Sequence, residues 1–169
     1  MNKTQSQMLA QYNQWANNTL LSALEKIPHE EITRPRRSLF RDIGHTLNHL
    51  LVIERIWKGH LIKQPHGYTA RNTPEYPEFS ELATQLRESD EWWVQWTKRQ
   101  SETDLAESVK FNYVSGQPGT MTGMQIIQHI VIHNSYHRGY IGDLMYQIPE
   151  CRAPQMDFSV YCTDVIKVE

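Results

Sequence analysis

The stretch His129-Ile-Val-Ile-His133-Asn-Ser-Tyr-His137-Arg-Gly139 decides how the rest of this chain is interpreted. Its three histidines follow one another at a spacing of four residues. On an α-helix, side chains four residues apart lie about 5–6 Å from each other, so two consecutive histidines can hold one metal ion from the same side. Zinc and similar ions take at least three protein ligands, so a further ligand must come from another segment.

A second histidine pair, His45 and His49, lies in another stretch with helical periodicity. The main apolar face of that stretch consists of Ile43, Leu47, Leu50, Ile53, Trp57 and Leu61. His49 lies at the edge of this face, where a side chain on a helix can point inward. We therefore expect a metal ion that is held between two helices.

The helix that carries the longer histidine run is predicted to begin after Thr122 and to end at Pro149. Thr122 and Gln125 have the spacing of a capping box. The inward face of this helix is expected to consist of Ile126, Ile130, His133, His137, Ile141 and Leu144. Two histidines occupy positions where the pattern calls for apolar residues, and a buried histidine must be hydrogen-bonded or bound to a metal. Core histidines with hydrogen bonds and no metal remain the alternative.

Apolar periodicity predicts three further helices. The first runs from about Thr4 to Ile27, the second from an N-cap at Ser38 to about Lys63, and the third from about Phe79 to Gln100. The polar and basic segment from Pro28 to Arg37 is interpreted as a loop.

The connection from Gln64 to Pro77 is longer than a hairpin between antiparallel helices needs. It predicts a crossover along the bundle, which leaves the second and third helices parallel. Alternating Val109, Phe111 and Tyr113, followed by turn residues, predict a small β-hairpin within Glu107–Met121. The tail from Pro154 to Tyr161 is expected to add a short capping helix.

Composition restricts the class of protein. A chain of 169 residues predicts a single domain that spans residues 1–169. A net charge of −2 without a long basic run argues against nucleic acid as a partner. No apolar run reaches the roughly 20 residues that a membrane helix needs, and the N-terminus has no apolar signal core. Cys151 and Cys162 are therefore interpreted as reduced thiols in a cytoplasmic protein.

Several catalytic classes are excluded by their missing motifs. The run from His129 to His133 lacks the glutamate of a zinc protease helix, and no Glu-x-x-His pair is available for a di-iron centre. The chain has no glycine-rich phosphate loop, nucleophile elbow or cysteine-pair zinc motif. A histidine-bound metal site with positions left open for water or substrate is the remaining candidate.

Four pieces of sequence resemble the DinB-like family of damage-inducible bacterial proteins. They are Tyr12-Asn-Gln-Trp-Ala-Asn17, the stretch from Asp42 to Trp57, the stretch from His129 to Gly139, and Pro154-Gln-Met-Asp157-Phe. The resemblance implies a four-helix bundle in up-down-down-up order. It also implies that the metal ligands are His49, His133 and His137, with His45 outside the ligand set. Tyr140 stands where the family often has glutamine.

The resemblance further implies a homodimer, and some relatives are metal-dependent transferases or isomerases that use low-molecular-weight thiols. Trp92, which lies off the apolar face of its helix, is an expected interface residue. Three functions stay open: transfer of such a thiol to a small-molecule substrate, metal-dependent hydrolysis, and metal binding without turnover in a stress response. Zinc or nickel is the expected metal, with iron as the alternative.

The last expectation concerns residues next to the ligands. Metal-binding histidines usually donate their second ring N–H to a carboxylate, a carbonyl or water. If the second and fourth helices are antiparallel, Glu54 and His129 should approach each other one layer away from the metal. We therefore expect a hydrogen bond between Glu54 and His129. Alternatively, Glu54 faces the open position of the metal and acts as a general base.

Overall fold

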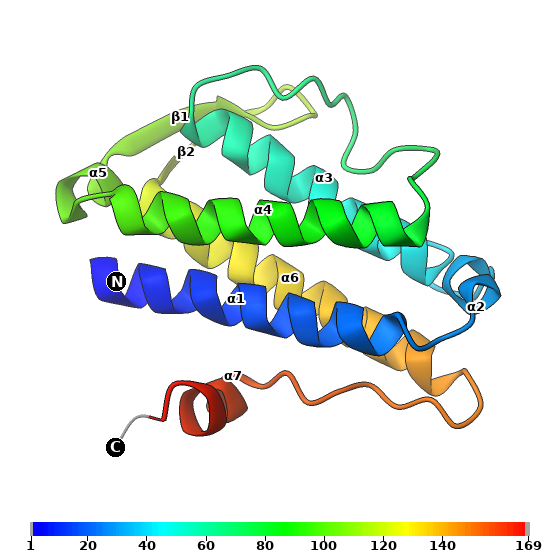
Figure 1. Ribbon diagram of the computed structural model, residues 1–169. Coiled ribbons are helices and arrows are strands. Elements are labelled where there is room, and N and C mark those ends of the chain that lie inside the picture. The colour runs from blue at the N-terminus through cyan, green and yellow to red at the C-terminus, as the bar shows by residue number, and fades with distance from the viewer. Residues whose placement is uncertain (1, 168–169) are drawn as a thin grey trace.

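The computed structural model describes residues 2–167, in which four long helices form a bundle that carries a β-hairpin at one end (Figure 1). The long helices are α1 (Lys3–Leu24), α3 (Ile43–Leu61), α4 (Phe79–Arg99) and α6 (Gly123–Tyr146). The short elements are α2 (His29–Thr33), α5 (Glu102–Ala106), α7 (Phe158–Val160) and the π-helical turn η1 (Tyr161–Val165). Strands β1 (Ser108–Asn112) and β2 (Pro118–Thr122) pair antiparallel, with Phe111 opposite Gly119.

The bundle has the predicted up-down-down-up order. Helices α1 and α6 run in one direction and α3 and α4 run in the other, so α3 and α4 are parallel (Figure 1). Residues 62–78 return along the outside of the bundle to make this possible (Figure 1). Helix α1 packs against α4 and α6, and α3 packs against the same two neighbours. The long connection between the second and third long helices is therefore confirmed as a crossover.

The start of α3 corrects one prediction. The helix begins at Ile43, not after Ser38, because Arg41 has a φ of 68° in the left-handed region, which a right-handed helix does not continue through. Asp42 is the N-cap, and its carboxylate accepts a hydrogen bond of 2.7 Å from the backbone N–H of His45. This cap sets the start, and hence the register, of the helix that carries His49.

The segment from Pro28 to Arg37 is not entirely a loop, because α2 forms within it and buries Ile32. The start of α6 is as predicted: Thr122 and Gln125 form a complete capping box. The predicted hairpin is also present, and Pro118 is tolerated because it opens β2 at the end of the ladder opposite Asn112.

Apolar residues of all four long helices fill the core in two clusters. One cluster joins α1, α3, α4 and the end of α6, and it includes Leu24, Leu47, Leu86 and Leu144. The other lies toward the hairpin and includes Ile53, Trp57, Phe111 and Ile130. None of the helices within residues 2–167 combines the length and apolar character that crossing a membrane requires.

Candidate metal centre

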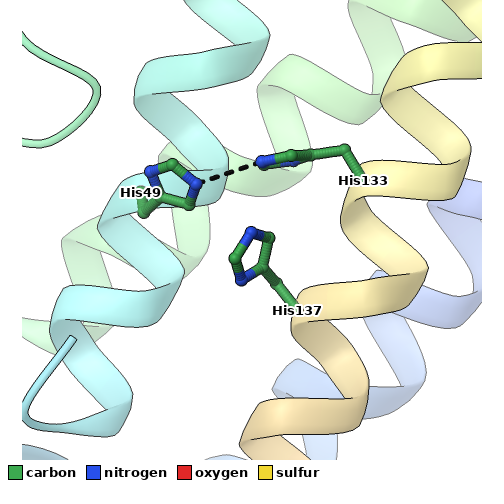
Figure 2. A group of neighbouring side chains, drawn as sticks. All are labelled: His49, His133 and His137. Carbon is green, nitrogen blue, oxygen red and sulfur yellow. Dashed lines mark hydrogen bonds between the residues drawn. The ribbon is translucent and has the colours of Figure 1, made fainter. Parts of the chain in front are cut away.

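Three histidines converge between α3 and α6. His49 comes from α3, and His133 and His137 come from consecutive turns of α6 (Figure 2). One ring nitrogen from each lies within 4.8 Å of the other two, and the Nε2 atoms of His49 and His133 are 3.0 Å apart. Nitrogens that share one zinc ion at about 2.0–2.1 Å lie about 3.3 Å from each other. The His49–His133 distance is close to this value, and His137 offers a third ring nitrogen within 4.8 Å of both, so the three residues could hold one metal ion.

Hydrogen bonds at the far side of two rings orient their lone pairs. His49 Nδ1 lies 2.6 Å from the carbonyl oxygen of Arg71, which only accepts, so Nδ1 carries the proton. His133 Nδ1 lies 3.4 Å from the side-chain oxygen of Asn134. The Nε2 atoms of the two rings face each other at 3.0 Å, a distance at which one ring can donate a hydrogen bond to the other. A divalent metal ion would displace that shared proton and bind both nitrogens, so this donor set could hold one.

Phe40 packs against the histidine cluster and lines the cavity beside it. Its ring stacks on His49 at a centroid distance of 4.4 Å and contacts His137 at 5.5 Å. His137 is 4% exposed, and its Nδ1 is buried without a hydrogen-bond partner among the described residues. An unpaired polar atom at a buried site is costly, and its presence beside the cluster is typical of a functional site.

Burial keeps these histidines neutral. It is the main cause that lowers the pKa of His133 to about 3 and that of His137 to about 4, and the neighbouring rings add to both shifts. Burial also lowers the pKa of His49. Since only the neutral imidazole binds a metal, the three side chains are in the binding form at neutral pH.

His45 lies outside the cluster. Its Nδ1 is 2.9 Å from the Asp42 carboxylate and its Nε2 is 3.1 Å from the carbonyl oxygen of Pro74. Both ring nitrogens therefore face oxygen acceptors, and neither directs a lone pair toward a metal.

The prediction of a hydrogen bond between Glu54 and His129 is wrong. Glu54 is fully buried and accepts hydrogen bonds from Ser89 and, at 2.6 Å, from the side-chain amide of Asn134. Five residues along a helix rotate a side chain by about 140°, so Glu54 points away from the face of His49 and into the bundle. His129 instead packs edge-on against Trp57 at a centroid distance of 4.9 Å. The same burial excludes Glu54 as a general base that faces the open metal position.

Asn134 connects Glu54 with the cluster. Its amide nitrogen donates to Glu54, and its oxygen is the atom beside His133 Nδ1. Glu54 therefore supports a candidate ligand through Asn134 and not through His129. Sequence reasoning missed Asn134, although a polar residue next to a ligand on an inward-facing helix was an available signal.

A buried network of charged groups continues from Glu54 across the bundle. Arg138, which is 2% exposed, donates to the side-chain oxygens of Asn13 and Asn17 at 2.9 and 2.8 Å. The amides of these two asparagines donate in turn to Asp90 of α4. Asn13 and Asn17 of α1, which were quoted above only as part of the family resemblance, therefore have a structural role in this network.

Burial raises the pKa of Glu54 to about 6, and burial together with the charge of Glu54 raises the pKa of Asp90.

A cavity of about 530 Å³ opens next to the histidine cluster. This volume lies in the range of small-molecule sites in proteins. Its apolar walls come from α3 and from the hairpin region, and they include Ile53, Ile56, Trp57, Tyr113, Val114 and Met121. His60 and His129 also line it. The cluster thus borders a space from which a small molecule could reach a metal ion bound by these histidines.

The fold and the site define a class: a helical bundle with three histidines that could bind a metal beside an open cavity. Residues 1–159 match the sequence pattern of the DinB family, so the chain belongs to that family. It is 26% identical to Protein DinB of Bacillus subtilis (strain 168) over 161 residues, which cover 90% of this chain and 91% of that protein. It is also similar to the crystal structure of a DinB-like protein from Bacillus cereus ATCC 10987. That similarity has a TM-score of 0.66 at 17% identity and covers 86% of this chain and 91% of the other. The solved structure supports the fold.

Proposed function

We propose that this protein binds one divalent transition metal ion, zinc or nickel, through His49, His133 and His137, and transfers a low-molecular-weight thiol to a small electrophile. The observation that carries the proposal is a cluster of three neutral imidazoles that opens onto a cavity of about 530 Å³. A divalent ion without charged ligands would favour the thiolate form of a bound thiol. In the transfer, sulfur bonds to the electrophilic carbon, the leaving group takes its electron pair, and the thiol proton passes to solvent.

The protein would contribute orientation and exclusion of water. Arg71 and Asn134 hold the rings of His49 and His133 in place through the contacts described above. Phe40 and Trp57 form apolar walls beside the cluster. The described residues that line the cavity include neither Cys151 nor Cys162, so the reacting thiol would come from a separate molecule.

Two observations favour thiol transfer over the alternatives. Hydrolysis needs a base close to the attacking water, and the candidate base Glu54 is 0% exposed. Metal binding for stability alone favours a fourth protein ligand, whereas the group found among residues 2–167 consists of three histidines.

Metal content tests the ligand set. Protein purified without an affinity tag should contain about one metal ion per chain, and His133→Ala should lose it because two imidazoles rarely complete a site. His45→Ala is the matched control, since it removes a histidine of α3 whose ring nitrogens are already occupied. Equal metal content in the wild type and in His133→Ala would refute the assignment.

A thiol screen tests the activity. Small thiols are paired with electrophiles in the presence and absence of zinc or nickel, and conjugate formation is followed by mass spectrometry. We expect metal-dependent turnover that His137→Ala abolishes. A thiol should also change the absorption spectrum of the cobalt-substituted protein. Failure of both measurements would favour metal binding without catalysis.

A further inference from the structure

The walls of the cavity divide it into two chemically different parts. The histidine cluster forms one end, and Phe40 stacks beside it. Most of the remaining wall is apolar or aromatic, with Ile53 and Trp57 on α3 and Tyr113 beyond β1. A ligand that fills this space would bury an apolar or aromatic body against that wall, because burial of apolar surface is the main favourable contribution in such pockets.

The charged group that lines the cavity is positive, and no negative side chain among residues 2–167 lines the cavity to balance it. Among its described lining residues, Arg71 is the one side chain with a full charge at neutral pH, and none is a carboxylate. Any bound metal would add further positive charge without a neutralising ligand. The cavity therefore favours a ligand with negative charge.

The backbone of Arg71 is held in place at the edge of the cavity, and the residue itself is exposed. Its backbone carbonyl accepts the hydrogen bond from His49 Nδ1 at 2.6 Å. The next residue, Asn72, donates to the carbonyl oxygen of His45 at 3.0 Å and accepts from the side chain of Asn48. The chain is thus tied to α3 at Arg71 and again at Asn72. Its positive charge also acts on His49, where it adds to the effect of burial in lowering the pKa.

We propose that this cavity binds a small organic anion, with a carboxylate held by the guanidinium of Arg71 and an apolar body against Trp57 and Ile53. A single arginine suits a carboxylate, which it can bind through two parallel hydrogen bonds, whereas phosphate sites usually add backbone N–H donors. The inference rests on the proposed function, because it assigns to that site the chemical class of its substrate or thiol.

The test compares one anion with its neutral counterpart of the same shape. The probes are 4-phenylbutyrate and 4-phenylbutanamide, and their binding is measured by titration calorimetry with metal-loaded and with chelator-treated protein. In both forms the wild type should bind the carboxylate about tenfold more tightly than the amide, the effect of one charge-assisted hydrogen-bonded pair. In Arg71→Gln this preference should disappear, because glutamine keeps the backbone carbonyl but removes the charge. Arg37→Gln removes an exposed arginine that does not line the cavity, and it should retain the preference.

Equal binding of the two probes by the wild type, or an unchanged preference in Arg71→Gln, would overturn the inference. Absence of binding by both probes would overturn it as well. Failure of this inference can be distinguished from failure of the proposed metal binding, because the chelator-treated protein tests the role of Arg71 without the metal. Loss of metal binding in His133→Ala is measured in turn without either probe.

Discussion

Asn134 is the residue that makes the candidate ligand His133 part of a larger polar structure. It is 0% exposed, and its amide contacts both Glu54 and the ring of His133. Groups that hydrogen-bond to metal-binding histidines fix the tautomer and the orientation of the ring. The function of His133 should therefore depend on a neighbour that binds no metal itself.

We predict that Asn134→Leu weakens metal affinity by about 10–100-fold although all three histidines remain. Leucine has the same branched arrangement of side-chain heavy atoms but offers no acceptor for His133 Nδ1. The measurement is competition with a chromogenic chelator, and circular dichroism verifies that the variant is folded. An affinity within about threefold of the wild type would show that Asn134 does not orient the ring.

Glu54 should make stability depend on pH. Its pKa is raised to about 6, mainly by burial, so the folded protein binds the proton more tightly than the unfolded chain does. The stabilisation from this proton is present below pH 4.5 and is lost as the pH rises through 6. Glu54→Gln keeps a donor and an acceptor for Ser89 and Asn134 without the charge.

Relative to the wild type, the free energy of unfolding of Glu54→Gln should therefore rise by about 2 kcal/mol between pH 4.5 and pH 7.5. Urea unfolding of chelator-treated protein at the two pH values provides the measurement, and the contributions of the histidines cancel in the difference. A difference that does not change with pH would mean that folding leaves the pKa of Glu54 unchanged and would contradict its rise through burial.

At the scale of elements, the start of α3 is packed against the crossover that precedes α4. Asp42 caps the helix and also accepts a hydrogen bond of 3.2 Å from the hydroxyl of Tyr76. The ring of Tyr76 lies so close to Gly44 that an added Cβ would be 2.4 Å from its Cε2 atom. Gly44 is therefore needed for the close contact between the first turn of α3 and the crossover.

Gly44→Ala should lower the free energy of unfolding by about 1–3 kcal/mol, because the aromatic ring must move to admit the methyl group. Gly139→Ala is the matched control in α6, where an added Cβ would meet no described atom within 4 Å. Alanine is the better helix former by up to about 1 kcal/mol, so this control should be neutral or stabilising. Equal stability of the two variants in urea would contradict the proposed role of the Tyr76 contact.

At the scale of the whole molecule, we propose a homodimer, the state that the family resemblance implies. Trp92 gives less support than its position in the sequence suggested, because it is half-buried and Lys58 lies 4.6 Å from the centre of its ring. The stronger support comes from Ile132 and Tyr136, which are 61% and 59% exposed on α6. Adjacent exposed apolar side chains often mark an interface.

Light scattering after size-exclusion chromatography should give twice the monomer mass of 19.9 kDa. Ile132→Glu should shift the protein toward the monomer, because a charge at a buried interface is costly. A monomer mass for the wild type at all concentrations would reject the dimer.

Local pattern in the sequence predicted the four long helices and placed histidines on the inward faces of two of them, and the family resemblance then indicated which three are the ligands. Histidines four residues apart must share one face of a helix, and the spacing of Thr122 and Gln125 indicates where that helix begins. The long connection after the second helix predicted the parallel pair. These inferences succeed because helical periodicity and capping depend on residues that are near each other in the chain.

The surroundings of the ligands were decided by tertiary structure. Glu54 lies 80 positions from Asn134, and His49 lies 22 positions from the carbonyl of Arg71 that orients it. The direction of Glu54 depends on which helices cover it, and the start of α3 depends on the left-handed conformation of Arg41. Such contacts follow from the way whole helices pack against each other. Spacing along one helix predicts which side chains share a face, but the partner that this face meets is set only when the bundle assembles.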